Sequence, residues 1–442
     1  MPEYDDDRLY DQHGFLVTIP ISSQLRARQD TQRFKTKVKW ITYLQKYYKS
    51  YPKGPTELSD KEVREFFDTY TPNKIDGHEM EIKLLCREGI PSQFRPHLWM
   101  RMSFAKHNMS NNPGLYKDLC EKSKDIDTVS TRQITLDISR TFTGHRYLCE
   151  PDTMDQIARV LRAFSIYNES VGYCQSMNFI CAFLFLFFEN EEEVFWMLNS
   201  VVDDLLPGYF SQVLAKVQVD SLVVQFFLKK YCPKVYSWLI TNHCDLRLFL
   251  TSWLMCIFTT KLPSITTVRL WDTLFSEGDK ILFRTSIALF ILLERRLIGM
   301  DKKPSKFFGK TYEIDDGIDP LIEWYTSIPI EHIPCPVETP GHFKEVLESL
   351  LPAMYNADLL IDTAFNGLGT FMRHSINSQR QKIGKEILKE TAEQVKRRIE
   401  RMRRLGGDVE TVKQLEEWVD SAETEPHIET GKQPSDGTCH IV

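Results

Sequence analysis

The sequence lacks the features that mark disulfide-rich, zinc-binding and membrane-spanning proteins. Its ten cysteines are spread over 442 residues, with no CxxC pair and no Cys/His cluster at zinc-finger spacing. We therefore expect neither a disulfide framework nor a metal site. The longest apolar run, Phe179–Phe188, has ten residues, which is too short to span a bilayer and predicts a buried helix. The acidic opening MPEYDDD has no signal-peptide core, so we expect a cytoplasmic protein.

Excess charge and nucleotide-binding motifs are also missing. The formal net charge is −6, from 61 acidic and 55 basic residues, which gives no electrostatic reason to bind nucleic acid. The sequence contains no Walker P-loop, no GxGxxG fingerprint and no Ser/His/Asp grouping at motif spacing. We expect this chain to bind no nucleotide, metal or other cofactor of its own.

Helical periodicity is what the sequence does contain. Apolar residues recur at three- and four-residue spacing through most of residues 81–300, with few strand alternations, which predicts an all-α fold. Ser59 and Glu62 have the spacing of a helix capping box. The predicted regions are a flexible arm (1–30), a helical extension (31–80), a helical domain (81–300), a proline-rich connection (301–340), a charged helical region (341–424) and a disordered tail (425–442).

The stretch ITLDISR, residues 134–140, places a carboxylate three residues before a guanidinium. On a strand, Asp137 and Arg140 would point to opposite faces, whereas on a helix they would share one face and could form an ion pair. Ile134 fits either interpretation. The residues alone favour an ordinary ion pair that contributes a few tenths of a kcal/mol.

The stretch GYCQSMN, residues 172–178, places a glycine turn before an apolar helix. Gln175 is expected near the start of that helix with its amide facing outward, and a capping or loop role is the ordinary interpretation. Cys174 has no base at a recognisable spacing, so we expect a core residue there and not a nucleophile.

Four blocks, taken in order, resemble the TBC domain of Rab GTPase-activating proteins. They are GIPSQFRPHLW, ITLDISRTF, GYCQSMNFI and SWLMCIFTTKLPSITTVRLWDTLFSEG, and they lie within residues 81–300. The family pattern IxxDxxR falls on Ile134, Asp137 and Arg140, and its YxQ pattern falls on Tyr173 and Gln175. The resemblance implies an all-helical, V-shaped domain of two subdomains. One departure is Ser176, where the family commonly has glycine; because serine is small, we expect the turn to be preserved.

The resemblance also implies a function. The chain would stimulate GTP hydrolysis by a Rab GTPase in trans and so regulate membrane traffic. Arg140 would be an arginine finger oriented by Asp137, and Gln175 a glutamine finger whose loop is fixed by Tyr173. GTP and Mg²⁺ would be bound by the GTP-loaded Rab partner. The alternative is a scaffold or effector that binds GTP-loaded Rab without turnover, so enzymatic activity is left open.

Residues 380–404 are strongly basic, with ten Lys/Arg against four Glu. A solvated helix face is the ordinary interpretation. The alternatives are that residues 378–410 contact an anionic membrane surface or an acidic partner helix. Because Rab proteins are lipid-anchored, we expect this protein to be peripheral on endomembranes. A break at Gly406-Gly407 predicts a helical hairpin or a broken coiled coil over residues 378–420.

Overall fold

The computed structural model describes residues 10–17, 23–48, 50–52, 58–69, 79–211, 213–297, 339–406 and 408–424. These residues contain helices and one isolated bridge between Tyr10 and Leu16, with no β-strand among them. The elements are α1 Ser23–Tyr47, α2 Asp60–Thr69, α3 Glu79–Glu88, α4 Arg95–Met102, α5 Ala105–Asn111, α6 Leu115–Ser123, α7 Val129–Ile138, α8 Pro151–Tyr167, α9 Met177–Leu184, α10 Glu191–Asn199, the π-helix η2 Ser200–Leu205, α11 Ala215–Tyr231, α12 Pro233–Thr241, α13 Arg247–Met255, α14 Ser264–Glu277, α15 Lys280–Leu297, α17 Pro340–Leu350, the 3₁₀ helix η4 Leu351–Ala353, α18 Ala357–Asp362, the π-helix η5 Thr363–Gly367, α19 Arg373–Leu405 and α20 Val409–Thr424.

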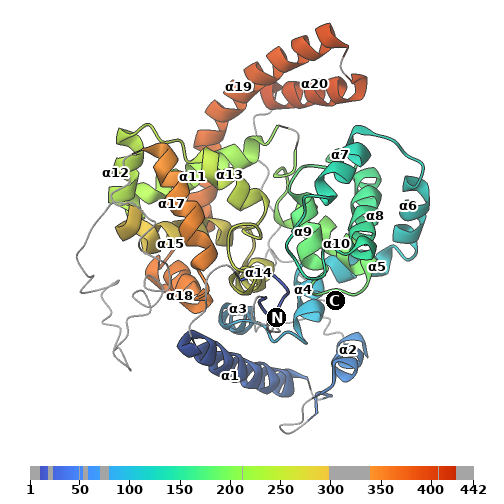
Figure 1. The fold of residues 1–442 in the computed structure, drawn as a ribbon, viewed down its shortest axis with the longest axis vertical. Coiled ribbons are helices and arrows are strands. Elements are labelled where there is room, and N and C mark those ends of the chain that lie inside the picture. Colours follow the sequence, from blue (N-terminus) through green and yellow to red (C-terminus); the bar gives the residue numbers. More distant parts are fainter. Residues whose placement is uncertain are drawn as a thin grey trace, which may run out of the picture.

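The helices form two groups that meet along α14 (Figure 1). In the first group, α6, α7, α9 and α10 pack around α8, and in the second, α12, α13 and α15 pack around α11. The connecting helix α14 packs on α3 and α4 as well as on α15 and α18. The predicted all-α architecture of two subdomains is confirmed.

The apolar run at residues 179–188 forms most of α9 and the turn after it. Phe183 and Leu184 are fully buried, so this stretch is the buried helix that its length predicted. Within the described part of the chain, none of the helices has the length and apolar character needed to cross a bilayer. No group of His, Cys, Asp or Glu residues in that part could hold a metal ion.

Part of the N-terminal stretch that was predicted as a flexible arm is folded. Residues 10–17 form a turn in which Phe15 packs edge-on against Phe142 and His145. Helix α1 already begins at Ser23. The prediction failed because the anchoring contacts come from residues more than 120 positions away in the chain. Residues 1–9 and 18–22 lie outside the described residues.

The predicted capping box at the start of α2 is confirmed. Glu62 accepts from the Ser59 backbone N–H at 2.8 Å, and the Ser59 hydroxyl accepts from the Glu62 backbone N–H at 3.3 Å. Val63, in the first turn of this helix, is fully buried. Two otherwise unpaired N–H groups at the helix start are thereby satisfied.

The packed body does not end at residue 300, where the sequence placed a domain boundary. Helix α17 inserts Phe343, which is fully buried and stacks on Trp238 and Phe290 of the second helix group. Further along, Arg380 of α19 is 1% exposed and its guanidinium donates to Asp220 and Asp279 at 2.7 Å. The start of the charged C-terminal region therefore completes the core. The proline-rich connection lies mostly outside the described residues.

Helices α19 and α20 form the predicted hairpin, and Gly406 closes α19 with a φ of +69°. Ala392, Val395 and Ile399 of α19 share a small apolar cluster with residues of α20. Helix α20 carries several acidic side chains, and Arg403 forms an ion pair with Glu416 across the hairpin. The two helices of the hairpin are thus joined by an apolar cluster and by an ion pair.

Candidate functional site

Helix α7 positions the ITLDISR stretch. Thr128 and Thr131 form a reciprocal capping box at its start, which leaves no doubt between helix and strand for residues 129–138. Ile134 is fully buried, whereas Leu136 on the other side of the helix is 55% exposed. The helix ends at Ile138, and Arg140 lies in the turn two residues later with an exposed side chain.

The predicted ion pair between Asp137 and Arg140 is not formed. The Asp137 carboxylate is buried and accepts from the Tyr173 hydroxyl at 2.9 Å and from the Gln133 amide at 3.1 Å. Arg140 touches Asp137 only through the backbone, where its N–H donates to the Asp137 carbonyl at 3.1 Å. The pair fails because α7 stops before Arg140, so the two residues do not share a helical face. No hydrogen bond or ion pair engages the Arg140 guanidinium among the described residues.

The loop before α9 is held against α7. The Tyr173 backbone N–H donates to the Ser130 hydroxyl at 3.2 Å, and its side chain reaches Asp137. Burial, together with the Asp137 charge, raises the pKa of the Tyr173 hydroxyl well above its usual range, so this group stays a hydrogen-bond donor. Gly172 has a φ of +59°, and a Cβ there would lie 3.0 Å from the Ser130 hydroxyl oxygen. Close approach of loop and helix therefore requires glycine at that position.

Gln175 is exposed in the turn that starts α9. Its side chain makes no hydrogen bond with the residues that the structure describes. The next residue, Ser176, has a φ of +93°, in the left-handed region that favours glycine. The turn is present despite the serine, as the sequence led us to expect, but it holds backbone strain. Phe142, two residues after Arg140, also has a positive φ, of +45°. Such strain persists only where surrounding contacts over-determine the backbone.

A buried asparagine, whose role the sequence analysis missed, links the two turns. Asn178 is 2% exposed, and its amide donates to the Thr141 hydroxyl at 2.7 Å. Its carbonyl oxygen accepts from the Ser176 N–H at 3.2 Å, and Thr141 in turn donates to the Asp137 carbonyl at 2.8 Å. The chain offered one signal: an amide residue placed among apolar residues at the start of a buried helix.

The structure brings together the residues that the sequence singled out. Their contacts differ from the expected ones, because Asp137 binds Tyr173 and not Arg140. Asp137, Tyr173 and Asn178 are held inside a hydrogen-bonded bridge. Arg140 and Gln175 emerge from the two bridged turns as exposed polar groups that have no side-chain partner among the residues the structure describes. A guanidinium can donate to an anion, and a carboxamide can both donate and accept. The arrangement can therefore offer charge and water-binding capacity to a molecule docked on this surface.

Cys174 is not a nucleophile in this setting. Burial raises the pKa of its thiol to about 12, and a reactive cysteine needs the opposite shift. The side chain is half-buried and packs against the main core, at the edge of the core position that the sequence predicted.

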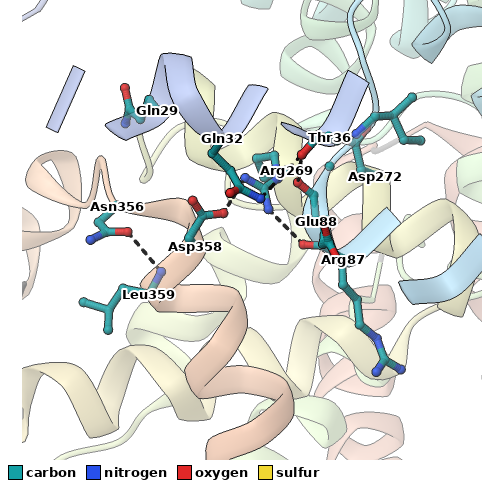
Figure 2. A network of polar contacts seen from close by, with 12 residues as sticks. Gln29, Gln32, Thr36, Arg87, Glu88, Arg269, Asp272, Asn356, Asp358 and Leu359 are labelled. Carbon is teal, nitrogen blue, oxygen red and sulfur yellow. Dashed lines mark hydrogen bonds and ion pairs between the residues drawn. The ribbon is translucent and has the colours of Figure 1, made fainter. Parts of the chain in front are cut away.

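A cavity of about 700 Å³ lies at the other end of the molecule, between α1, α14 and α18. Figure 2 shows its polar wall, where Arg269 donates to Asp358 at 2.7 Å and to the Arg87 carbonyl at 2.8 Å. On the α1 side, Gln29 donates to the Tyr355 carbonyl at 2.9 Å. None of the residues from the α7 and α9 turns lines this cavity. These contacts fasten α18 and α3 to α14, and α1 to the segment just before α18.

Comparisons with known proteins agree with the motif blocks. The model of the Rab-GTPase-TBC domain family matches residues 92–298. Human growth hormone-regulated TBC protein 1 is 34% identical over 252 residues, which cover 53% of this chain and 74% of that protein. Human TBC1 domain family member 2A is 33% identical over 239 residues, or 52% of this chain. The match spans only 26% of that longer relative.

The fold is also similar to a solved structure. The crystal structure of the Chlamydomonas flagellar RabGAP TBC domain superposes with a TM-score of 0.58, and the two chains are 23% identical. The alignment covers 82% of this chain and 100% of that chain. This structural alignment extends beyond the 207 residues from position 92 to position 298 that the family model matches. The longer match agrees with the finding that the C-terminal helices belong to the same packed body.

Proposed function

This chain belongs to the Rab-GTPase-TBC domain family, and on that premise we propose that it is a GTPase-activating protein for a Rab GTPase. Arg140 is the arginine finger and Gln175 the glutamine finger, both supplied in trans to a GTP-loaded partner. The observation that carries the proposal is that both side chains are exposed and unpartnered within the described chain, while the groups around them are buried and hydrogen-bonded to one another.

The arginine acts on developing charge. Hydrolysis of GTP builds negative charge on phosphoryl oxygens, and a guanidinium inserted from a partner is worth about 10³–10⁵ in rate. This corresponds to about 4–7 kcal/mol of barrier. A surface ion pair contributes an order of magnitude less, so keeping Arg140 free of protein partners costs little relative to what it can contribute. Lysine would be a poor substitute, because its point charge lacks the planar fork.

The glutamine acts on the nucleophile. Its carboxamide can accept a hydrogen bond from the attacking water and donate one to a phosphate oxygen. GTP and Mg²⁺ belong to the Rab partner, and this chain contributes only the two fingers and their support. Tyr173 and Asn178 hold the glutamine turn, and the Asp137 backbone carbonyl holds the arginine turn.

The test is GTP hydrolysis by a panel of purified Rab proteins. Wild-type protein is expected to accelerate hydrolysis by at least one Rab, and Arg140→Ala is expected to lose about 10³-fold of that acceleration. Arg140→Lys should recover little. Arg132→Ala is the matched control, because Arg132 is an exposed arginine of α7, eight residues before Arg140, and its charge pairs with Asp127 at 3.4 Å. Stimulation that survives Arg140→Ala would end the proposal.

A second function is a scaffold or effector that binds GTP-loaded Rab without turnover. The observation in its favour is Ser176, a strained residue directly after the glutamine finger. Under this alternative, affinity for GTP-loaded Rab would be unchanged by Arg140→Ala and Gln175→Ala, and no Rab in the panel would be stimulated.

We further propose that the protein acts in membrane traffic, as a cytoplasmic protein peripheral on endomembranes. The reason is the substrate class, since a lipid-anchored GTPase presents its nucleotide close to a bilayer. Fractionation of cells that express the tagged full-length chain would test this, with the protein expected in both soluble and membrane fractions and salt expected to release the bound part. Recovery in the soluble fraction alone, at low salt, would contradict it.

A further inference from the structure

The α19–α20 hairpin projects from the body toward its tip (Figure 1), while Trp418 and Ala422 of α20 still pack against the main core. We call residues 392–424 the hairpin arm. The preceding part of α19 is fixed to the body, because Ile376 and Ile387 lie in the main core and Arg380 is bound by two buried carboxylates. The arm has its own apolar cluster, in which Val395 and Ile399 pack against α20. The arm is thus a projection on a rigid base.

The face of α19 opposite α20 carries an arginine stripe. Arg397, Arg401 and Arg404 follow one another at spacings of four and three residues, which places them on one side of the helix. Val395 and Ile399 occupy the other side. All three arginines are exposed. Neither Arg397 nor Arg401 has an ion pair or side-chain hydrogen bond to any described residue, whereas the neighbouring Arg403 forms an ion pair with Glu416.

The tip of the arm exposes two large aliphatic side chains next to this stripe. Leu405 is 74% exposed and Val409 is 81% exposed. At the tip, the Asp408 carboxylate accepts from the Thr411 N–H and hydroxyl, both at 2.7 Å. Segment 396–409 contains six basic and two acidic residues. The tip therefore combines exposed arginine side chains with exposed aliphatic side chains.

We infer that the arginine stripe and the aliphatic tip together bind the surface of an anionic lipid bilayer. Guanidinium groups pair with phosphate through two parallel hydrogen bonds, so lipid headgroups suit the stripe. The headgroup–acyl boundary buries aliphatic side chains that are flanked by cations. A nucleic acid would match the charge but would leave Leu405 and Val409 uncovered. The bilayer accounts for both features.

The arm lies on the same side of the molecule as the proposed fingers. Val213 packs against the apolar cluster of the arm, and it belongs to the loop whose Ser211 carbonyl contacts the Cys174 thiol, next to Gln175. Arg132 of α7 is among the charges that lower the pKa of Asp408, after its hydrogen bonds with Thr411. The next step rests on the proposed function. A chain that is bound to the bilayer through the arm presents its fingers beside the membrane that anchors the GTPase.

Sedimentation of the full-length chain with vesicles tests the inference without any GTPase. Phosphatidylcholine vesicles with and without phosphatidylserine are the probes. Wild type is expected to bind only the phosphatidylserine vesicles and to be released by salt. The stripe variant, with Arg397→Gln, Arg401→Gln and Arg404→Gln, should bind about 100-fold more weakly, at about fivefold for each cation near the surface. The tip variant, with Leu405→Gln and Val409→Gln, should bind about tenfold more weakly.

The matched control removes the same number of charges from the base of the same helix. It carries Lys382→Gln, Lys385→Gln and Lys389→Gln, at three exposed lysines outside the arm, and should bind within about threefold of wild type. Unchanged circular dichroism melting would confirm that each variant is folded. The inference is overturned if wild type ignores phosphatidylserine vesicles, if the lysine control weakens binding as much as the stripe variant, or if wild type binds polyglutamate or RNA but no vesicle.

Hydrolysis assays separate this inference from the proposed function. On a soluble, unanchored Rab that responds to wild type, the stripe variant should stimulate hydrolysis equally. On the same Rab anchored to phosphatidylserine vesicles, the stripe variant should stimulate hydrolysis less than wild type does. A chain that sediments with vesicles but stimulates no Rab would contradict the proposed GTPase-activating function and would still support the membrane contact.

Discussion

Replacing Asn178 by alanine would break the bridge between the two finger turns. Its carboxamide accepts from the Ser176 N–H at 3.2 Å and donates to the Thr141 hydroxyl at 2.7 Å. Because the side chain is only 2% exposed, water reaches the orphaned groups poorly. The Ser176 N–H would lose its acceptor, which costs about 1–3 kcal/mol, and the Thr141 hydroxyl would lose a donor while keeping its bond to the Asp137 carbonyl. The free energy of unfolding is therefore expected to fall by about 2–4 kcal/mol.

Activity should fall for a separate reason, which is misplacement of the fingers. A shift of about 1 Å in a reacting group can cost about 10²-fold in rate. Loss of the bridge frees the Arg140 and Gln175 turns to move relative to each other. We expect kcat for stimulated GTP hydrolysis to fall by about 30- to 100-fold, with KM for the Rab changed by less than about threefold, because the surrounding surface is intact.

Single-turnover hydrolysis, measured over a range of Rab concentrations and well below the melting temperature of the variant, would test whether kcat falls while KM is retained. Thr141→Val removes the same bridge from its other end, so its effect on kcat should not add to that of Asn178→Ala. Leu239→Ala is the matched stability control: this side chain is fully buried in α12 of the other helix group, and its loss costs about 2–5 kcal/mol. If Leu239→Ala lowers kcat as much as Asn178→Ala, or if Asn178→Ala leaves kcat unchanged, the positioning argument is wrong.

Three further outcomes follow from the structure. Arg380→Ala leaves the buried Asp220 carboxylate without its cation, while Asp279 keeps its ion pair with Arg373 at 2.8 Å. The variant should lower the free energy of unfolding in urea by about 3–5 kcal/mol, whereas Arg403→Ala, at an exposed pair, should cost less than about 1 kcal/mol; similar losses for both would refute the anchoring role. Ser176→Gly should raise the free energy of unfolding by up to about 1 kcal/mol, because it removes left-handed strain and loses part of that gain to unfolded-chain entropy; a loss of stability would contradict the strain. Burial lowers the pKa of His13 to about 4 from 6.5, so the unfolded chain binds the extra proton between these pH values and stability should fall as pH drops from 6.5 to 4. His13→Gln should flatten that part of the stability curve, and an unchanged pH dependence would show that other groups set it.

Local signals in the sequence predicted most of the helical fold. The capping box at Ser59, the buried run at residues 179–188 and the hairpin break at Gly406 each depend on residues within a turn or two of one another. Such patterns report local geometry directly. The family pattern likewise selected Arg140 and Gln175 from many arginines and glutamines, and both are exposed in neighbouring turns.

Contacts between distant residues could not be predicted in this way. Arg380 is 160 residues from Asp220, and no local pattern distinguishes it from the solvated basic residues that follow it on α19. The family match ends at residue 298, close to the boundary placed at residue 300, but the sequence did not show that Phe343 returns to the core after a proline-rich stretch. Composition suggested a linker and a charged tail, whereas packing made the far side of that linker part of the domain.

The pairing expected for Asp137 failed in an informative way. A spacing of three predicts an ion pair only if the helix continues through both residues, and α7 ends at Ile138. The carboxylate turns inward to Tyr173, so the residue beside the arginine supports the glutamine loop. Asn178, beside the glutamine, reaches back to Thr141, next to the arginine.

Each of the two turns is thus held by a residue that lies beside the other finger, and this has a physical consequence for a two-finger mechanism. If each finger were braced by its own neighbour, the two turns could shift independently, and a productive distance for one would not secure the other. Crossed hydrogen bonds between turns that lie 35 residues apart make their positions interdependent, so one rigid unit meets the partner's nucleotide. Rigid placement to within about 0.5 Å is what a preorganised site requires. The short spacings within IxxDxxR and YxQ therefore reflect bonds made between the two motifs, and neither motif is expected to position its finger when the other is disrupted.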